Sequence, residues 1–338
     1  MNLDEVSRFI QEHFTDGLVV VIGSGLSAAE GISGMGSLAD HLQHKSTSLS
    51  GADAALWRDI STVIADNRGL EAALIEHPPS PSLEPWIISE TIELLLPEEQ
   101  RVVSDVVNSR SSLRLTALLQ KIMIPDRGLP IITTNYDRLV ELACEMAGLH
   151  VDTTTLGHFA AEFDDEKSCM SSCIGIKRSG KQALLNHRER AVVLKPHGSL
   201  DWFQVGNTAR RCSMDVDAER LIITPVSNKY RAGYEFPFDR QRELANRFID
   251  RCSKLLIVGY GFNDDHLQTH LHEKIREGIP TLIVTRSISR QISAVVNSGP
   301  NCICVSRDDS GSTVTTKDNE CPIPIGIWDI GVLADECL

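Results

Sequence analysis

The sequence predicts an α/β fold, with a doubly wound parallel sheet and an α-helical insertion. Short apolar runs of strand length recur at residues 18–22, 129–134, 192–196, 220–224, 254–259, 281–285 and 302–305. Runs this apolar are typical of strands that are buried on both faces of a parallel sheet. Helical patterns of crossover length separate the later runs, so repeated βαβ units are the simplest arrangement.

Other segments complete the predicted organisation. Residues 3–14 place their apolar side chains on one helical face and predict an opening amphipathic helix. Residues 51–124 predict a helical insertion or cap, interrupted by a Pro/Ser-rich break. The sheet domain then comprises residues 1–50 and 125–310, and residues 311–338 form a C-terminal tail. We expect the polar residues 160–182 to form a loop and residues 308–321 to be a flexible lead into the tail.

Composition narrows the class of protein. With 42% hydrophobic and 23% charged residues, the 338-residue chain is typical of a soluble globular protein. Its formal net charge of -13 argues against non-specific nucleic-acid binding. The N-terminal residues lack the basic and apolar regions of a signal peptide, and no apolar run is long enough to cross a membrane. We therefore expect a cytoplasmic protein.

The nine cysteines are odd in number and irregularly spaced, which predicts reduced thiols and no disulfide framework. Cys169 and Cys173 have a metal-like spacing, but no second cysteine pair or histidine cluster lies within zinc-ribbon distance. We expect no zinc and no other metal site.

A glycine-rich turn follows the first strand. Residues 23–28 fit G-x-G-x-x-A, with a helix expected from about Ser27. Gly23, Ser24, Gly25 and Ser27 are therefore candidates to hold a phosphate, since glycines let backbone N–H groups approach an anion closely. The alternative is a simple tight turn.

Two common nucleotide-dependent enzymes fit poorly. A dehydrogenase needs an acidic residue about 20 positions on, at the end of a second strand. Asp40 instead lies in a segment with a helical pattern, where it would be a surface charge. The turn also lacks the lysine of a P-loop.

Polar residues follow the run at 129–134. Thr134, Asn135 and Asp137 would lie at the carboxyl edge of the sheet, where open α/β folds bind ligands. The alternative is that Thr134 or Asn135 caps a helix that begins at Tyr136, with Asp137 in its first turn.

Further polar residues follow later strands. His197 follows the run at 192–196 and is a candidate general base, although a single histidine can also be structural. Gly259 and Gly261 precede a helix with Asn263 or Asp264 as its N-cap, which predicts a second backbone cradle. Thr285 ends the run at 281–285 and could contact a ribose or phosphate.

Together these motifs resemble the sirtuin family, and more closely a bacterial sirtuin-like branch of anti-phage defence proteins. IGSGLSAAEGI is similar to the G-A-G-x-S-x-x-S-G-I loop, TTNYD to T-Q-N-x-D, KPHGS to the catalytic histidine turn and GYGFND to a later G-T-S-type loop. The resemblance spans most of residues 17–305. It implies a Rossmann-like domain in which NAD is bound.

The resemblance also implies roles for single residues. The turn of Gly23, Ser24, Gly25 and Ser27 would line the phosphates of NAD, with Gly259 and Gly261 on the adenosine side and Thr285 near the adenine ribose. Asn135 and Asp137 would order the ribose and the attacking group, and Thr134 takes the place of the family's glutamine. His197 would be the base.

Departures from the protein-modifying sirtuins indicate a different reaction. Ser33-Gly34-Met35-Gly36 replaces their Pro-Asp-Phe-Arg, and their zinc ribbon is missing. The zinc module helps to build the acyl-lysine cleft, so its absence and the helical insertion favour water as the nucleophile. We therefore expect an NAD glycohydrolase that produces ADP-ribose and nicotinamide.

An unregulated NADase would damage its host, so the resemblance further implies control by assembly. A homo-oligomer and a HerA-type ATPase partner are expected on this basis. From the net charge and the short apolar runs we expect no membrane partner and no direct nucleic-acid binding. The alternatives are an NAD-dependent protein deacylase and a non-catalytic scaffold that binds NAD or ADP-ribose.

Overall fold

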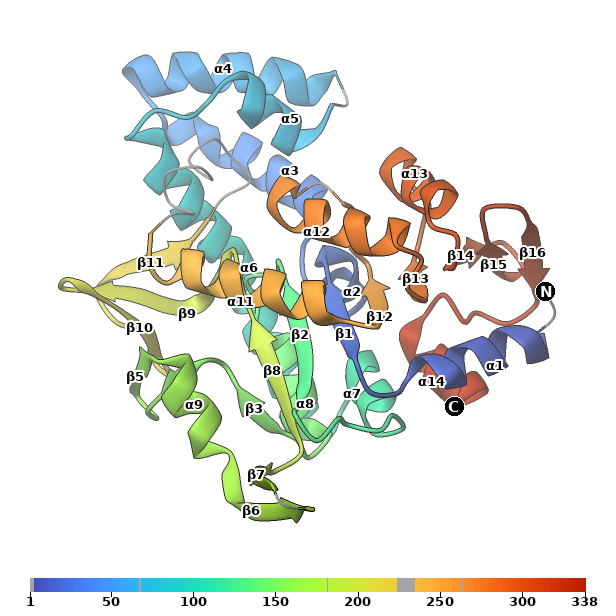
Figure 1. Cartoon of the computed structure of the whole chain (residues 1–338). Coiled ribbons are helices and arrows are strands. Elements are labelled where there is room, and N and C mark those ends of the chain that lie inside the picture. Colours follow the sequence, from blue (N-terminus) through green and yellow to red (C-terminus); the bar gives the residue numbers. More distant parts are fainter. Residues whose placement is uncertain (1–2, 67, 181, 224–234, 263) are drawn as a thin grey trace.

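A nine-stranded, mostly parallel sheet organises the fold in the computed structural model, which describes residues 3–66, 68–180, 182–223, 235–262 and 264–338 (Figure 1). The strands run, in spatial order, β16 (Glu320–Ile323), β15 (Gly311–Thr315), β14 (Cys302–Asp308), β13 (Thr281–Thr285), β12 (Lys254–Val258), β1 (Leu18–Ile22), β2 (Leu129–Thr133), β8 (Arg190–Leu194) and β3 (His150–Asp152). The pairs from β14 to β3 are parallel, whereas β15 and β16 run antiparallel at one edge. The predicted α/β class and parallel sheet are confirmed.

Helices cover both faces of this sheet. In chain order, the helices among the described residues are α1 (Leu3–His13), α2 (Ser24–Ala29), α3 (Met35–Lys45), the 3-10 turn η1 (Ser46–Ser48), α4 (Gly51–Ala65), α5 (Gly69–Glu76), α6 (Leu83–Val107), α7 (Arg114–Leu119), α8 (Leu139–Met146), α9 (Asp165–Ser171), α11 (Phe238–Arg251), α12 (Asp265–Arg276), α13 (Arg290–Ser298) and α14 (Ile330–Cys337).

The central strand β1 shows why the sheet has two cores. All five of its side chains are buried. Val20 and Ile22 join a cluster with residues of α1, α6, α7, α8 and α14, whereas Val19 and Val21 join a cluster with α11, α12 and α13. Because successive side chains of a strand point to opposite faces, a continuous apolar run serves both layers.

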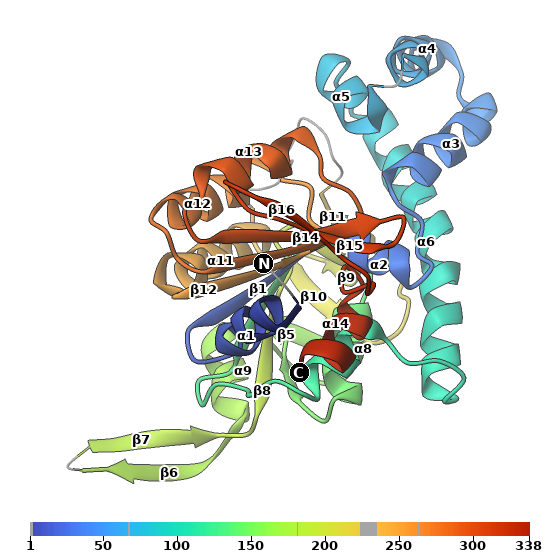
Figure 2. The same ribbon diagram turned by 90° about the vertical axis from the view of Figure 1, so that its right-hand side faces the viewer.

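Two smaller sheets lie outside this sandwich. One has the order β11 (Glu219–Ile222), β9 (Gly198–Val205), β10 (Thr208–Cys212), β5 (Ala160–Phe163) and β4 (Thr155–Leu156), with antiparallel pairing. The predicted strand at 220–224 therefore belongs to this antiparallel sheet, and residue 224 lies outside the described residues. The other is the hairpin of β6 (Cys173–Ser179) and β7 (Gln182–His187), which projects from the body (Figure 2).

Helices α3–α6 stand to one side of the sheet (Figure 2). They have their own apolar cluster, in which Trp57 of α4 packs edge-on against Trp86 of α6. The long helix α6 also sends Leu95, Val102 and Val106 into the core of the main sheet. It therefore joins the helical segment to the body.

The predicted loop at 160–182 is wrong. It contains β5, α9 and the first strand of the hairpin. Asp164 caps α9 by accepting a hydrogen bond from the backbone N–H of Lys167 at 2.9 Å. This segment lacks a clear apolar period, so only its capping residue and its strand pairing reveal the structure.

The predicted flexible lead at 308–321 is also wrong. Residues Gly311–Thr315 form β15, which pairs with β14 and buries alternate side chains. Its small polar residues alternate with Val314, and the strand pairs with β14 on one side and β16 on the other. The chain then continues into α14, whose Ile330 and Leu333 lie in the core.

The strand order places a crevice beside β1. From β1 the chain continues to β2 on one side, and the later strands β12, β13 and β14 build outward on the other. Such a switch in direction opens a crevice at the carboxyl ends of the strands. Within the described residues, no helix is long and apolar enough to span a membrane.

Candidate active site

A cavity of about 980 Å³, counting its open mouth, lies at this carboxyl edge. Gly23 follows β1, Asn135 follows β2 and Tyr260 follows β12, and all three line the cavity. Residues of α3, α5 and α6, including Met35, form another part of its wall. The cavity therefore lies between the sheet and the helical segment.

Two glycine turns pack backbone to backbone at the base of the cavity. The N–H of Gly25 donates to the carbonyl of Gly259 at 2.9 Å. A Cβ on Gly23 would lie 2.5 Å from that carbonyl oxygen, and one on Gly25 would lie 2.7 Å from the Cα of Gly259. Gly259 also has a φ of +57°, a conformation that favours glycine. The close approach explains why both turns are glycine-rich.

The helix after the first turn begins earlier than predicted. Helix α2 starts at Ser24, with Gly23 as its N-cap. Ser27 thus lies inside the helix, where its side chain is 5% exposed and lines the cavity.

Asn135 is held in the cavity wall by two hydrogen bonds. Its Nδ2 donates to the carbonyl of Gly23 at 3.0 Å and to Oγ of Ser27 at 2.7 Å. The alternative that Thr134 or Asn135 caps a helix from Tyr136 is wrong, because α8 begins at Leu139. The side chain instead ties the end of β2 to the first glycine turn.

Asp137 places a buried carboxyl beside this amide. It is 3% exposed, and its Oδ1 accepts a hydrogen bond from the backbone N–H of Leu139 at 3.2 Å. Burial raises the pKa of Asp137, although the Lys195 ammonium and a hydrogen bond from Ser27 lower it. The carboxylate is therefore costly to bury without a cation in the cavity.

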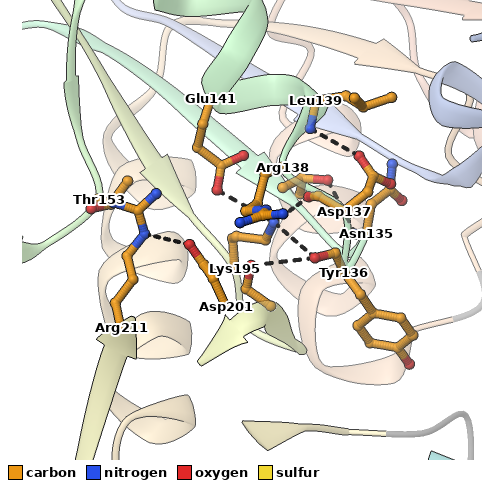
Figure 3. Close-up of polar contacts among 12 residues, drawn as sticks. Asn135, Tyr136, Asp137, Arg138, Leu139, Glu141, Thr153, Lys195, Asp201 and Arg211 are labelled. Carbon is orange, nitrogen blue, oxygen red and sulfur yellow. Dashed lines mark hydrogen bonds and ion pairs between the residues drawn. The ribbon is translucent and has the colours of Figure 1, made fainter. Parts of the chain in front are cut away.

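A buried lysine supports the turn that carries these residues (Figure 3). Nζ of Lys195 donates to the carbonyls of Tyr136, at 3.3 Å, and Asp137, and lies 3.4 Å from Oε1 of Glu141. Burial raises the pKa of Glu141, with Lys195 acting in the opposite direction. Lys195 thus fixes the main chain behind the cavity, a role that the sequence pattern did not reveal.

His197 lies between β8 and β9 and faces a carboxylate. Its Nε2 is 2.6 Å from Oδ2 of Asp264, and the two side chains are 15% and 6% exposed. Asp264 was predicted only as a possible helix cap, and Asn263, the other predicted cap, lies outside the described residues. A carboxylate in this position can orient an imidazole ring.

The ionisable side chains around the cavity are mostly acidic. Glu71, Asp137 and Asp264 line it together with His197, and none of its described lining residues is lysine or arginine. Such a wall favours positive charge, whether present in a ligand or developing during a reaction. Among the described residues, no group of three or more His, Cys, Asp or Glu side chains could hold a metal.

Most of the predicted site residues meet at this cavity. Those that line it are Gly23, Ser24, Ser27, Thr134, Asn135, Asp137, His197 and Gly261. Gly25 and Gly259 are not among the lining residues and instead join the two turns to each other. Thr285 is not among the lining residues, and its Oγ1 donates to the carbonyl of Ser287 at 3.1 Å.

Comparison with known proteins gives a partial family match. Residues 130–293 match the family model of the SIR2-like domain. This SIR2-like segment begins within β2 and contains Asn135, Asp137, His197 and Gly259, whereas the first glycine turn precedes it. The chain has no match among the curated proteins.

The solved structures that are similar include Sir2 enzymes. A complex of Sir2 with a p53 peptide and NAD+ is 12% identical and has a TM-score of 0.43, with 99% of this chain and 96% of that chain covered. An ADP-ribose complex of a mutant Sir2 homologue is 12% identical and has a TM-score of 0.44, with 100% of this chain and 95% of that chain covered.

Proposed function

We propose that this chain hydrolyses NAD at the bond between nicotinamide and ribose, producing ADP-ribose and nicotinamide. The convergence of Asn135, Asp137 and His197 beside the Gly23 turn in one cavity carries the proposal. The SIR2-like match supports it, since three of these residues lie within the matched segment.

The wall of the cavity suits the charge that this reaction develops. When the bond from C1′ of the ribose to the nicotinamide nitrogen breaks, both electrons leave with the nicotinamide, which becomes neutral. Positive charge then develops on the ribose. Asp137, Asp264 and Glu71 line the cavity, and carboxylates placed there before the reaction begins would stabilise this charge in the transition state.

The remaining roles follow from the geometry of the side chains. Asn135 is held by Gly23 and Ser27 and therefore presents a fixed polar group to the ribose. We assign His197 as the base that takes a proton from water as its oxygen bonds to C1′, and Asp264 as the residue that positions the imidazole.

Substitution of the two central residues tests the proposal. Asn135→Ala and His197→Ala should each lower NAD turnover by about a hundredfold or more, because each removes a group at the reacting centre. Loss of NAD and formation of nicotinamide are measured by chromatography. Asn297→Ala and His44→Ala are matched controls, since both residues are exposed and lie outside the cavity.

Three outcomes would contradict this assignment. Unchanged turnover in both Asn135→Ala and His197→Ala would show that the site is elsewhere. Turnover that appears only when an acyl-lysine peptide is added would indicate a deacylase. Binding of ADP-ribose by a chain that never consumes NAD would indicate a scaffold.

The biological setting that we propose is anti-phage defence inside the cell, by depletion of NAD. Such an activity must be kept in check, and we infer control through a homo-oligomer and a HerA-type ATPase partner. Purifying the chain together with the product of a neighbouring gene, and comparing NAD turnover with and without it, tests this control.

A further inference from the structure

The β6–β7 hairpin carries several large aliphatic side chains that are exposed to solvent. It projects away from the other layers in both views (Figures 1 and 2). Ile174, Ile176, Leu184 and Leu185 are 56%, 70%, 47% and 48% exposed. Exposed aliphatic side chains gathered on one projecting element mark a candidate contact surface.

The pairing of the hairpin places apolar side chains on both of its faces. Ile176 lies opposite Leu185, so these two share one face. Leu184 lies opposite Lys177 and belongs to the other face. Among the described residues, β6 and β7 pair only with each other, which leaves an open edge on each strand. A two-stranded sheet of this kind is only marginally stable in water without further packing.

The base of the hairpin is nevertheless fixed to the body. The N–H of Arg188 donates to the carbonyl of Ser172 at 3.0 Å, and Oγ of Ser172 lies 2.8 Å from Nδ1 of His187. Nζ of Lys177 lies 3.0 Å from Oδ2 of Asp126. The first two contacts close the hairpin at the end of α9, and the third joins β6 to the segment before β2, while the strands stay exposed.

The charge of the hairpin is opposite to that of the chain. Residues 173–188 contain four basic side chains and no acidic one, whereas the whole chain has a formal net charge of -13. The same residues contain no Phe, Tyr or Trp on which a base could stack. Aliphatic and basic side chains together fit an acidic protein, and a second copy of this chain, with its formal net charge of -13, is one.

We propose that the hairpin is a dimerisation arm that docks on the acidic surface of a second copy of this chain. In a two-fold dimer each copy gives one arm and receives one, so the contact is made twice. The aliphatic side chains supply the apolar area that is buried in the dimer. The basic side chains select the acidic partner and discourage pairing with the edge strands of unrelated proteins. This inference does not depend on the proposed NAD hydrolysis.

Size-exclusion chromatography with light scattering tests whether the hairpin mediates dimerisation. The wild-type chain should have twice the mass of the 37.2-kDa monomer, and the dimer should weaken as the salt concentration rises. The double variant Ile176→Asp, Leu185→Asp should raise the dissociation constant by at least about tenfold. Arg178→Glu should weaken the dimer as well. Val107→Asp is the control, since Val107 is 62% exposed at the end of α6 and should leave the mass unchanged.

Circular dichroism and thermal melting check that each variant is folded, which exposed positions should permit. A wild-type chain that stays monomeric at every concentration overturns the proposal. So does a double variant with the mass and dissociation constant of the wild type. A wild-type oligomer that disappears after nuclease treatment, in a chain that binds an oligonucleotide through the hairpin, would show a nucleic-acid arm instead.

Discussion

Asp137 combines burial with a role in the proposed reaction. Because burial raises its pKa in the folded chain, folding is penalised when the carboxyl is ionised. The stability of the wild type should therefore fall as the pH rises through the folded-state pKa, whereas a neutral side chain avoids this cost.

The variant Asp137→Asn tests whether the carboxylate lowers the stability of the chain while it supports the proposed reaction. Its melting temperature should exceed that of the wild type by an amount that grows with rising pH, while NAD turnover falls by about a hundredfold. Thermal melts at several pH values, paired with NAD assays, provide the measurement. Parallel pH profiles for the two proteins would show that the carboxylate costs nothing to bury.

At the residue scale, the sequence predicted side chains that directly follow a strand. Asn135, Asp137 and His197 are recognisable because the carboxyl ends of parallel strands meet at one edge. Asp264 meets His197 across 67 positions, and Glu71 reaches the cavity from the helical segment. No local pattern shows such pairs, because they depend on the packing of separate elements.

At the element scale, His13 fastens α1 to the sheet. Its Nε2 lies 2.7 Å from the carbonyl oxygen of Leu255 in β12, and its side chain is buried. Burial lowers the pKa of His13 to about 4, with Lys254 acting in the same direction and the bond to Leu255 against it. The unfolded chain therefore takes up a proton at a higher pH than the folded chain.

This difference predicts a loss of stability in acid. The contribution of His13 to the free energy of unfolding should be complete above about pH 6.5. It should decline by about 3 kcal/mol as the pH falls toward 4. His13→Gln removes the titration and should flatten this part of the profile in urea unfolding. His44→Gln, on the exposed face of α3, should follow the wild type, and a His13→Gln profile as steep as the wild type's would contradict the assignment.

Elements with strong apolar runs were predicted well, and polar ones were not. Strands β1 and β13 have the predicted bounds because their residues are buried on both faces. Strand β15 was predicted to be part of a flexible lead and helix α9 to be part of a loop, because each is short and polar. Their formation depends on a neighbouring strand and on a capping carboxylate, which act through contacts more than through composition.

At the scale of the whole molecule, one ion pair links the helical segment to the site. Glu99 of α6 is fully buried and accepts hydrogen bonds from the backbone N–H of Arg138 at 2.6 Å and from its guanidinium Nε at 3.0 Å. Arg138 follows Asp137 directly, so α6 holds the end of the turn that carries the proposed catalytic residues. The helical segment therefore supports the site as well as walling it.

Removing this link should affect both stability and turnover. Glu99→Ala leaves a partly buried guanidinium and an N–H without their partner, which should cost about 3 kcal/mol of unfolding free energy. NAD turnover should fall because the turn is no longer held. Glu93→Ala, on the same helix but paired at the surface with Lys45, should change neither the urea midpoint nor turnover. Equal effects of the two substitutions would show that α6 supports the site only by apolar packing.

The contact between the two glycine turns has a consequence for how such a chain can vary. Gly23 and Gly25 meet Gly259 across more than two hundred positions of sequence, with no room for a methyl group on either side. A side chain introduced in one turn would push the two backbones apart. A smaller residue in the other turn cannot restore the contact, because that turn already has glycine at the contact. Among related chains, these positions should therefore be retained or lost as a unit, together with the crevice above them.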